Sequence, residues 1–496
     1  MDPQRHIPAS AGWEAWIPRL VRALVFITLG LIPLGILRLG FLPPDEALSH
    51  AAKAISGKSW QEILVMPKEL TIDHQRGWHA LLEAVFRTFH PTADTLVAAG
   101  AVAMFLLFSF SFFACRSRPE AVALMMVLSA VTIPGFVSRL MLGRPSLAAA
   151  ASLVLLLSLW APANRIGRLR PAFTVFLFAS AVWIQGDYLL YLLPVAAFFT
   201  AGRIRQGLAL TGCWVAGCAL AAWLSGEPLA FCGQQARQIA LSYNSSLPIR
   251  LLARDARPSG GDVSFLLTLA ILLLFQKQLT GRWEKSRFLD PCFLLGVFGW
   301  ILGFRAARFW LDWGLPAMMI WMAARIHTGL VWKSGYASWG RLAFAGLLCL
   351  ALFLCFTGDL EERWTGNIAE PLLGREDKSL AEWLPGSGGI IYSIEPGVFY
   401  RTFYKNPDAP WRYVLGFEAG FMLPEDRSVL FDIQMRTLYD SFDVWARKMR
   451  AEDRLMIRGS SSAKPKIPLL EWHFAPDYRI WIGRVRRTRL PSLPAP

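Results

Sequence analysis

About eleven predominantly apolar stretches recur through the first 358 residues of this chain, separated by short polar junctions. A helix that crosses a bilayer needs about 20 such residues. Inside lipid the backbone must satisfy its own hydrogen bonds, which a helix does. The sequence therefore predicts an α-helical polytopic membrane protein with about eleven transmembrane helices. The stretches lie at roughly 17–38, 94–115, 119–138, 145–163, 171–185, 188–201, 207–224, 262–278, 288–304, 309–325 and 341–358.

Composition agrees with this class and argues against several others. Of the 496 residues, 54% are hydrophobic and only 18% are charged, whereas soluble domains carry about 25% charged residues. The net charge of +15 is spread over short clusters between apolar runs rather than gathered in one patch, so nucleic acid is not an expected partner. No cysteine follows Cys355, so the last part of the chain has no disulfide framework.

Basic clusters occupy every second junction, which is the pattern that sets orientation in a membrane. This positive-inside pattern predicts a cytoplasmic N-terminus. An odd number of spans then places residues 359–496 outside the cytoplasm, and we expect the first run to be retained as a span. The clusters are Arg116 and Arg118; Arg165, Arg168 and Arg170; Arg203 and Arg205; Lys277, Arg282, Lys285 and Arg287; and Arg325, Lys333 and Arg341.

Three segments of some size are predicted to lie outside: residues 39–92, 225–261 and 359–496. In the first, DEALSHAAKAIS and HQRGWHALLEAVFRTF show helical apolar spacing, typical of helices that lie in the membrane interface. In the last, GIIYSI, WRYVLGF, SVLFDIQ and YRIWIGRV predict strands and MRTLYDSFDVWARKMR predicts a helix. The terminal segment is thus expected to be a soluble α+β domain.

An acidic pair, Asp45 and Glu46, directly follows the first span in FLPPDEALSH. Acids in the first turn of a helix complement the helix dipole, and that alone can explain them. A carboxylate at the membrane surface can equally act as a general base toward an acceptor hydroxyl.

Other polar residues at the outside junctions also have two interpretations. Asp187, in WIQGDYLLY, is either a turn residue or part of a site. Asp73 and His74, in IDHQRGWH, either sit on a solvated helix or belong to the same site. His74 and His79 are five residues apart and do not share a helix face, so their spacing does not indicate a metal site.

Arg305 and Arg308, in GFRAARFWLDWGLP, stand at an outside junction where positive charge is disfavoured. Their side chains either extend along the membrane surface or hold an anion. Phosphate suits a pair of guanidinium groups geometrically.

These features together resemble the GT-C membrane glycosyltransferases, which include the protein O-mannosyltransferases and the lipid A aminoarabinose transferase. FLPPDEALSH resembles their acidic motif, and RAARFWLDWGLPAMMIWMA resembles their late arginine-containing span. The resemblance implies that Asp45 is the catalytic carboxylate, with Glu46 as its neighbour or substitute. It also implies that Arg305 and Arg308 bind the phosphate of a polyprenyl-linked sugar donor.

A second acid of the family has no clear counterpart here, and Glu69, Asp73 and Asp187 all stay open. No cofactor is assigned, no metal ligand is proposed, and the need for a divalent metal also stays open.

The resulting expectation is a transferase in a bacterial inner membrane, with a GT-C-like transmembrane domain over residues 1–358 and a periplasmic domain over residues 359–496. It would move a sugar from a polyprenyl-phosphate-linked donor to a glycan, lipid or protein acceptor, in contact with membrane lipids. A lipid-linked sugar flippase or transporter is an alternative, which predicts discontinuous helices in paired repeats. A non-catalytic membrane assembly subunit is another alternative.

Overall fold

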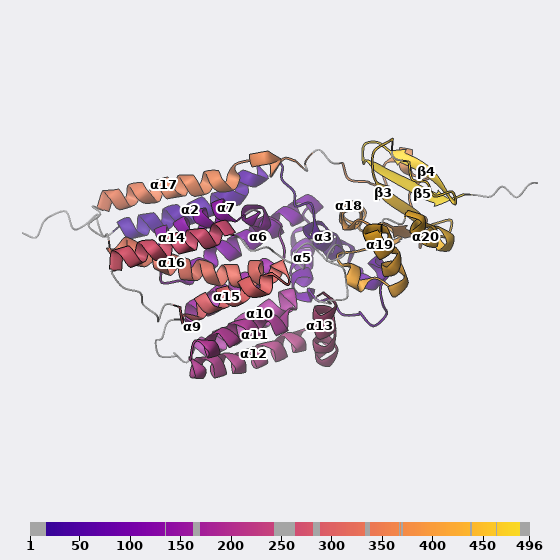
Figure 1. Ribbon diagram of the computed structural model, residues 1–496. Helices are drawn as coiled ribbons and strands as arrows, with labels where there is room; N and C mark the ends of the chain where they lie inside the picture. The colour runs from indigo at the N-terminus through magenta and orange to yellow at the C-terminus, as the bar shows by residue number, and fades with distance from the viewer. Residues whose placement is uncertain are drawn as a thin grey trace, which may run out of the picture.

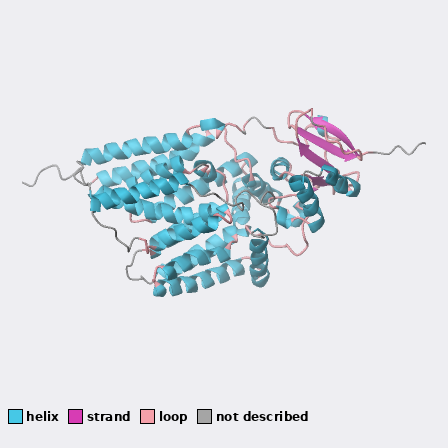
Figure 2. Ribbon diagram, in the orientation of Figure 1, coloured by secondary structure: helices cyan, strands magenta, loops and turns pink. Residues whose placement is uncertain are grey.

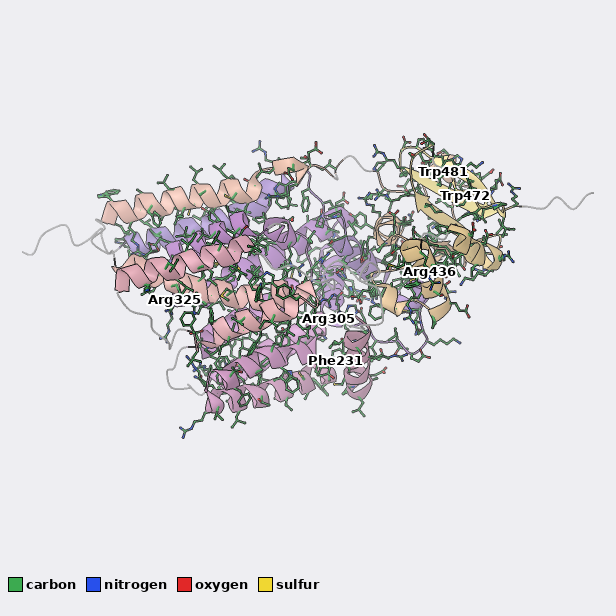
Figure 3. The ribbon with its side chains drawn as sticks, viewed as in Figure 1. Phe231, Arg305, Arg325, Arg436, Trp472 and Trp481 are labelled. Atoms are coloured by element: carbon green, nitrogen blue, oxygen red, sulfur yellow. The ribbon has the colours of Figure 1, made fainter. Side chains whose placement is uncertain are left out.

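The computed structural model describes residues 16–133, 135–161, 169–242, 263–280, 288–332, 338–366, 368, 371–436, 439–462 and 464–486. A bundle of side-by-side helices forms most of the molecule, and a smaller unit that carries the strands lies beyond one end of it (Figures 1 and 2). Arg305 lies at the end of the bundle that faces this unit, and Arg325 lies at the opposite end (Figure 3).

The apolar runs predicted as spans all contain helix, which confirms the helical prediction. Four helices in the described part of the chain are both long and apolar enough to cross a bilayer: α2, α6 with the turn after it, α12 and most of α17. The number of crossings and their direction stay predictions. The run helices are α2 (Ile17–Leu37), α6 (Ala93–Ser111), α7 (Pro119–Thr132), α9 (Ser146–Trp160), α10 (Leu169–Gln185), α11 (Leu192–Thr200), α12 (Ile204–Leu224), α14 (Val263–Thr280), α15 (Pro291–Gly303), α16 (Leu315–Trp332) and α17 (Ser338–Thr357).

The first segment predicted to lie outside, residues 39–92, folds into three helices, α3 (Glu46–Ser56), α4 (Trp60–Ile63) and α5 (Arg76–Phe89). The two helices predicted from apolar spacing are therefore confirmed as helices. α3 is an alanine-rich helix with Leu48, Ala51 and Ala52 buried. It ends at Gly57, whose φ of +63° is the left-handed conformation that favours glycine.

Helix α13 (Pro228–Ser242) belongs to the second outside segment and runs across the direction of the bundle helices in Figure 1. The rest of that segment, residues 243–261, lies outside the described residues, as do the predicted basic residues at 165–168, 282–287 and 333.

The terminal unit holds a five-stranded sheet in the order β2-β1-β3-β5-β4. β1 is parallel to β2 and β3, whereas β5 is antiparallel to β3 and β4. The predicted α+β character of this unit is confirmed. The elements are β1 (Ile390–Tyr392), β2 (Arg412–Tyr413), β3 (Arg454–Arg458), β4 (Leu470–Ala475), β5 (Ile480–Val485), α18 (Pro396–Lys405), α19 (Pro424–Arg436) and α20 (Phe442–Lys448).

One strand prediction in this unit is wrong, because SVLFDIQ lies within helix α19. Pro424 begins that helix and Glu425 and Asp426 fill its first turn, which are helix-start signals. The buried residues Val429 and Ile433 are four apart, so they lie on one helix face. Strands β3 and β4 were not among the predicted strands.

The terminal unit is fastened to the first outside segment. Leu64 forms a parallel bridge with Tyr413, and the Val65 amide donates to the Tyr413 carbonyl at 2.8 Å. Lys58 Nζ donates to the Ala409 carbonyl at 2.6 Å. The backbone of the first loop thereby extends the edge of the terminal sheet next to β2.

Candidate active site

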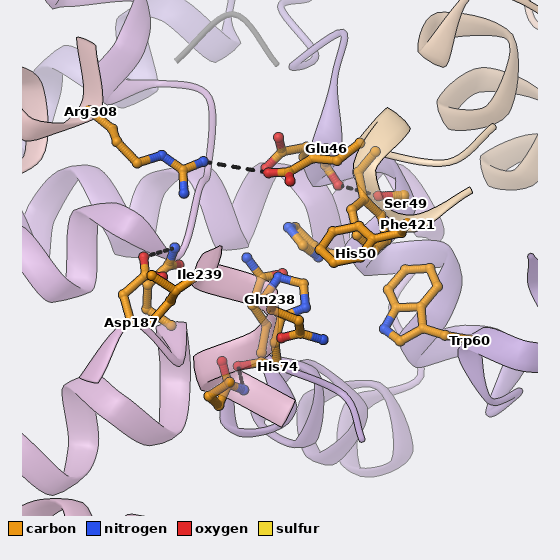
Figure 4. Close-up of a pocket in the computed structure, with 15 residues that line it drawn as sticks. Glu46, Ser49, His50, Trp60, His74, Asp187, Gln238, Ile239, Arg308 and Phe421 are labelled. Carbon is orange, nitrogen blue, oxygen red and sulfur yellow. Dashed lines mark hydrogen bonds and ion pairs between the residues drawn. The ribbon is translucent and has the colours of Figure 1, made fainter. Parts of the chain in front are cut away.

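A small enclosed cavity of about 60 Å³ lies where α3, α13 and the end of the bundle meet the terminal unit (Figure 4). Most of the side chains that line it are polar or charged, although the site is close to the apolar bundle. Polar side chains in such a place are costly, and they mark functional sites. They are Glu46, Ser49, His50, Trp60, His74, Gln75, Gln185, Asp187, Gln235, Gln238, Ile239, Arg308, Phe417, Glu418 and Phe421.

Helix α3 contributes Glu46 and His50 to the lining. Glu46 is the first residue of the helix, and His50 follows one turn later. Residues four apart lie on the same face of a helix, so both side chains point the same way. Figure 4 shows both beside the cavity.

Asp45 precedes α3 and is not among the residues that line the cavity. Its Oδ2 atom accepts from Arg144, with Nη2 at 2.7 Å and Nε at 3.2 Å. Its other oxygen, Oδ1, is buried and accepts no hydrogen bond from the part of the chain that the structure describes. The two adjacent acids therefore differ in position: Asp45 is bound to Arg144, and Glu46 lines the cavity.

Arg308 reaches the cavity from the junction between α15 and α16. It precedes a π-helical turn at Phe309–Gly314, a conformation often found at functional sites. Its Nη2 atom lies 3.6 Å from Glu418 Oε1 of the terminal unit, and each side chain is 17% exposed. Phe417, Glu418 and Phe421 close the cavity from the terminal side, and we call these three residues the roof.

Asp187 enters the cavity from the tight junction between α10 and α11. Gly186 precedes it with a φ of +86°, and a Cβ atom there would lie 2.6 Å from the His74 carbonyl oxygen. Only glycine fits this close approach. Burial raises the pKa of Asp187, and the Arg308 guanidinium opposes that rise.

His74 lines the cavity close to Phe417, with 5.7 Å between the ring centroids. Burial lowers the pKa of His74 to about 4, although Asp73 opposes the change. Gln235 Nε2 of α13 donates to the His74 carbonyl at 3.3 Å, which fixes the loop before α5.

Asp73 does not line the cavity itself but is hydrogen-bonded to His79. Its Oδ2 atom is 2.5 Å from His79 Nδ1, and His79 Nε2 is 2.9 Å from His50 Nδ1. Burial alone raises the pKa of Asp73, but the charge and hydrogen bond of His79 outweigh burial and hold it below its usual range. A hydrogen-bonded chain thus leads from Asp73 to a residue of the cavity wall.

The structure brings together most of the residues singled out in the sequence. Asp45 and Asp73 are each next in the chain to a lining residue. Arg305 is exposed and is not among the lining residues, so it does not share the position of Arg308. The predicted residues that line the cavity are Glu46, His74, Asp187 and Arg308.

Several lining residues were not predicted, above all His50, Gln235, Gln238 and Glu418. His50 follows Glu46 by four residues, and this spacing was a usable signal. Gln235 and Gln238 are three apart in α13, which gives that helix a polar face. Glu418 had no signal, because the sequence does not show which residue of the terminal unit reaches the cavity.

No three His, Cys, Asp or Glu side chains are grouped to hold a metal ion within the described ranges. The need for a divalent metal therefore gains no support from these residues.

No protein-family model and no curated protein matches the sequence. Among solved structures, the chain is similar to ArnT from Cupriavidus metallidurans bound to undecaprenyl phosphate, with 12% identity, a TM-score of 0.51, and coverage of 97% of this chain and 99% of that one. It is also similar to the apo state of the same protein, with 12% identity, a TM-score of 0.54, and coverage of 96% and 98%. Over nearly its whole length the chain therefore has the fold of ArnT, a GT-C glycosyltransferase.

Proposed function

We propose that this chain is a membrane glycosyltransferase of the bacterial inner membrane. It moves a sugar from a polyprenyl-phosphate-linked donor to an acceptor on the periplasmic face. The ArnT-like fold supports a lipid-linked sugar transferase in general, and one of the similar ArnT structures holds undecaprenyl phosphate.

The observation that carries the proposal is the meeting of Glu46, Asp187 and Arg308 in one cavity. They come from three elements far apart in the sequence, at the end of the bundle beside the terminal unit. A lipid-phosphate donor keeps its tail in the bilayer and its phosphate near the surface. A site for this donor must combine a cation for the phosphate with a base for the acceptor, and this cavity combines both.

In the proposed reaction a carboxylate of the acidic pair takes a proton from the acceptor as it attacks the anomeric carbon. The sugar–phosphate bond breaks, and Arg308 stabilises the negative charge that builds on the departing phosphate. One displacement inverts the anomeric centre. Glu46 is favoured as the base because it lines the cavity, whereas the Asp45 carboxylate is bound to Arg144.

The roof is proposed to close the site and to help position the acceptor. Glu418 Oε1 lies 3.6 Å from Arg308 Nη2. A donor phosphate would compete with this carboxylate for the guanidinium, so donor binding and movement of the roof would be coupled.

The test uses the full-length protein in nanodiscs with a panel of undecaprenyl-phosphate-linked sugars and a membrane lipid extract as the acceptor source. We expect release of undecaprenyl phosphate with at least one donor. In the variant that carries both Asp45→Asn and Glu46→Gln, the rate of release should fall by a factor of about 10² or more. Full turnover with both acids neutralised would refute the proposed mechanism.

A further inference from the structure

Three side chains form a buried hydrogen-bonded chain that ends at the cavity: Asp73, His79 and His50. The side chains of His79 and Asp73 are 7% and 17% exposed, and His50 is 4% exposed as a residue. The contact distances are 2.5 Å from Asp73 Oδ2 to His79 Nδ1 and 2.9 Å from His79 Nε2 to His50 Nδ1. The remaining ring nitrogen, His50 Nε2, is buried and has no hydrogen-bond partner among the described residues, and His50 lines the cavity.

The positions of the protons in this chain follow from its geometry. An ionised Asp73 can only accept, so His79 Nδ1 carries a proton. If His79 is neutral, its Nε2 accepts from His50 Nδ1, and His50 Nε2 then presents a lone pair to the cavity. If His79 is an imidazolium, its Nε2 donates to His50 Nδ1, and His50 Nε2 carries the proton instead.

These two states differ by one proton, which enters or leaves at His50 Nε2. When a proton binds there, the proton on His50 Nδ1 moves to His79 Nε2. His50 ends neutral in its other tautomer, and the positive charge ends on His79 beside the Asp73 carboxylate. A buried charge is costly unless it is paired, and His79 has that partner whereas His50 does not.

We propose that His50, His79 and Asp73 form a proton relay that takes up the proton released in the transfer reaction. This inference rests on the proposed transferase function and specifies where its proton goes. Glu46 removes the proton from the acceptor and passes it to His50 Nε2, one helical turn away on the same face of α3. The Nδ1 proton of His50 then passes to His79 Nε2. Glu46 is a carboxylate again after this step, so the base is restored without water entering the closed cavity.

The surroundings of His50 favour its role in accepting and passing on a proton. Burial, followed by the nearby His79 and His74, lowers the pKa of His50 well below its usual value. His50 is therefore neutral at pH 7 and has a lone pair free to accept. The charged and titratable groups around it are Glu46 on its own helix, His79 on α5, Asp73 and His74 on the preceding loop, Arg144 before α9, and Arg308 and Glu418 at the cavity.

The first test needs no substrate. Protein labelled with ¹⁵N-histidine in nanodiscs is followed by NMR as the pH is lowered, with ring signals assigned from His50→Gln and His79→Gln. We expect His50 to change from the Nδ1–H to the Nε2–H tautomer in the same step in which His79 becomes an imidazolium. If His50 keeps one tautomer while His79 titrates, the relay is wrong.

The second test uses release of undecaprenyl phosphate from the donor identified above. His79→Gln can still hydrogen-bond to both neighbours but cannot carry a proton. We expect at least a tenfold fall in turnover, a smaller solvent deuterium isotope effect, and unchanged binding of undecaprenyl phosphate, because acid–base groups contribute about 10²–10⁴ in rate. Asp73→Asn should act in the same direction, and His90→Asn, at the exposed C-cap that follows α5, is the control.

The results separate the two proposals. A wild-type protein that releases no undecaprenyl phosphate from any donor would contradict the transferase, while the tautomer experiment would still decide the relay. Wild-type turnover and isotope effect in His79→Gln would overturn the relay and leave the transferase standing.

Discussion

Arg144 Nη2 lies 2.7 Å from Asp45 Oδ2, so the guanidinium holds the acid that precedes the cavity-lining Glu46. The two side chains of the pair are 15% and 20% exposed, respectively. The adjacent acids therefore have different surroundings: Asp45 is paired with Arg144 before the start of α3, and Glu46 lines the cavity.

This difference predicts separate consequences for the two acids. Asp45→Asn should lower stability by about 1–3 kcal/mol, because Arg144 loses a charged hydrogen-bond partner. Glu46→Gln should leave the melting temperature nearly unchanged and lower turnover by about 10². Thermal unfolding in detergent and undecaprenyl phosphate release measure the two effects. A turnover loss confined to Asp45→Asn would assign the base to Asp45.

Arg308→Lys is expected to weaken binding of undecaprenyl phosphate by about tenfold, because a lysine cannot hold phosphate through two parallel hydrogen bonds. Arg305→Lys, measured beside it, shows whether the exposed arginine also contacts the donor. Arg87→Lys, at an exposed position paired with Glu83, is the control. Unchanged lipid binding after substitution of both Arg305 and Arg308 would show that neither arginine binds the phosphate and that their side chains extend along the membrane surface.

Glu418→Gln is expected to strengthen binding of undecaprenyl phosphate by about two- to fivefold. The substitution removes a carboxylate that competes with phosphate for Arg308, and loose ion pairs contribute about 0.2–1 kcal/mol. Lipid titration monitored by intrinsic tryptophan fluorescence measures the change. Weaker binding in this variant would show that Glu418 supports the donor site instead.

Acid should destabilise the protein through His74. Its pKa is lowered to about 4 from a usual value of 6.5, so the unfolded state binds a proton first as pH falls. The contribution of His74 to the free energy of unfolding is therefore fully present above pH 6.5, and it declines as the pH falls from 6.5 to about 4. His74→Gln should flatten the decline in melting temperature over this range. An unchanged slope would contradict the assignment.

The orientation in the membrane gives a further prediction. A reporter that is active only outside the cytoplasm should be active when fused after residue 360 and silent when fused after Gly202, beside the basic pair Arg203 and Arg205. Reversed signals would place the cavity on the cytoplasmic side and remove the basis for a periplasmic acceptor.

Local signals in the sequence were sufficient for the helices and for part of the site. Apolar runs located the bundle helices, and the Asp45–Glu46 pair marked the start of α3. These features depend on neighbouring residues, which a sequence displays directly. Helix α19 was mistaken for a strand because Val429 and Phe431 have high strand propensity, while the helix-start signals at Pro424 outweigh that propensity.

Long-range contacts explain what was missed. The resemblance implied that Asp45 is the catalytic carboxylate, whereas the structure joins Asp45 to Arg144, 99 residues away. The link from His79 to His50 spans 29 residues, and spacing along one helix could not show it. Glu418 reaches Arg308 only through the folding of the terminal unit.

The attachment of Leu64 to Tyr413 has a consequence for how the protein is made. The lining residues from Glu46 to His74, which we call the floor of the cavity, are synthesised early. The roof at Phe417 to Phe421 is synthesised much later. A chain that stops before residue 411 has the acids and histidines of the floor but lacks the partner strand that Leu64 needs. The complete cavity can therefore form only after residues 411–421 have been translated and have packed against the residues of the floor.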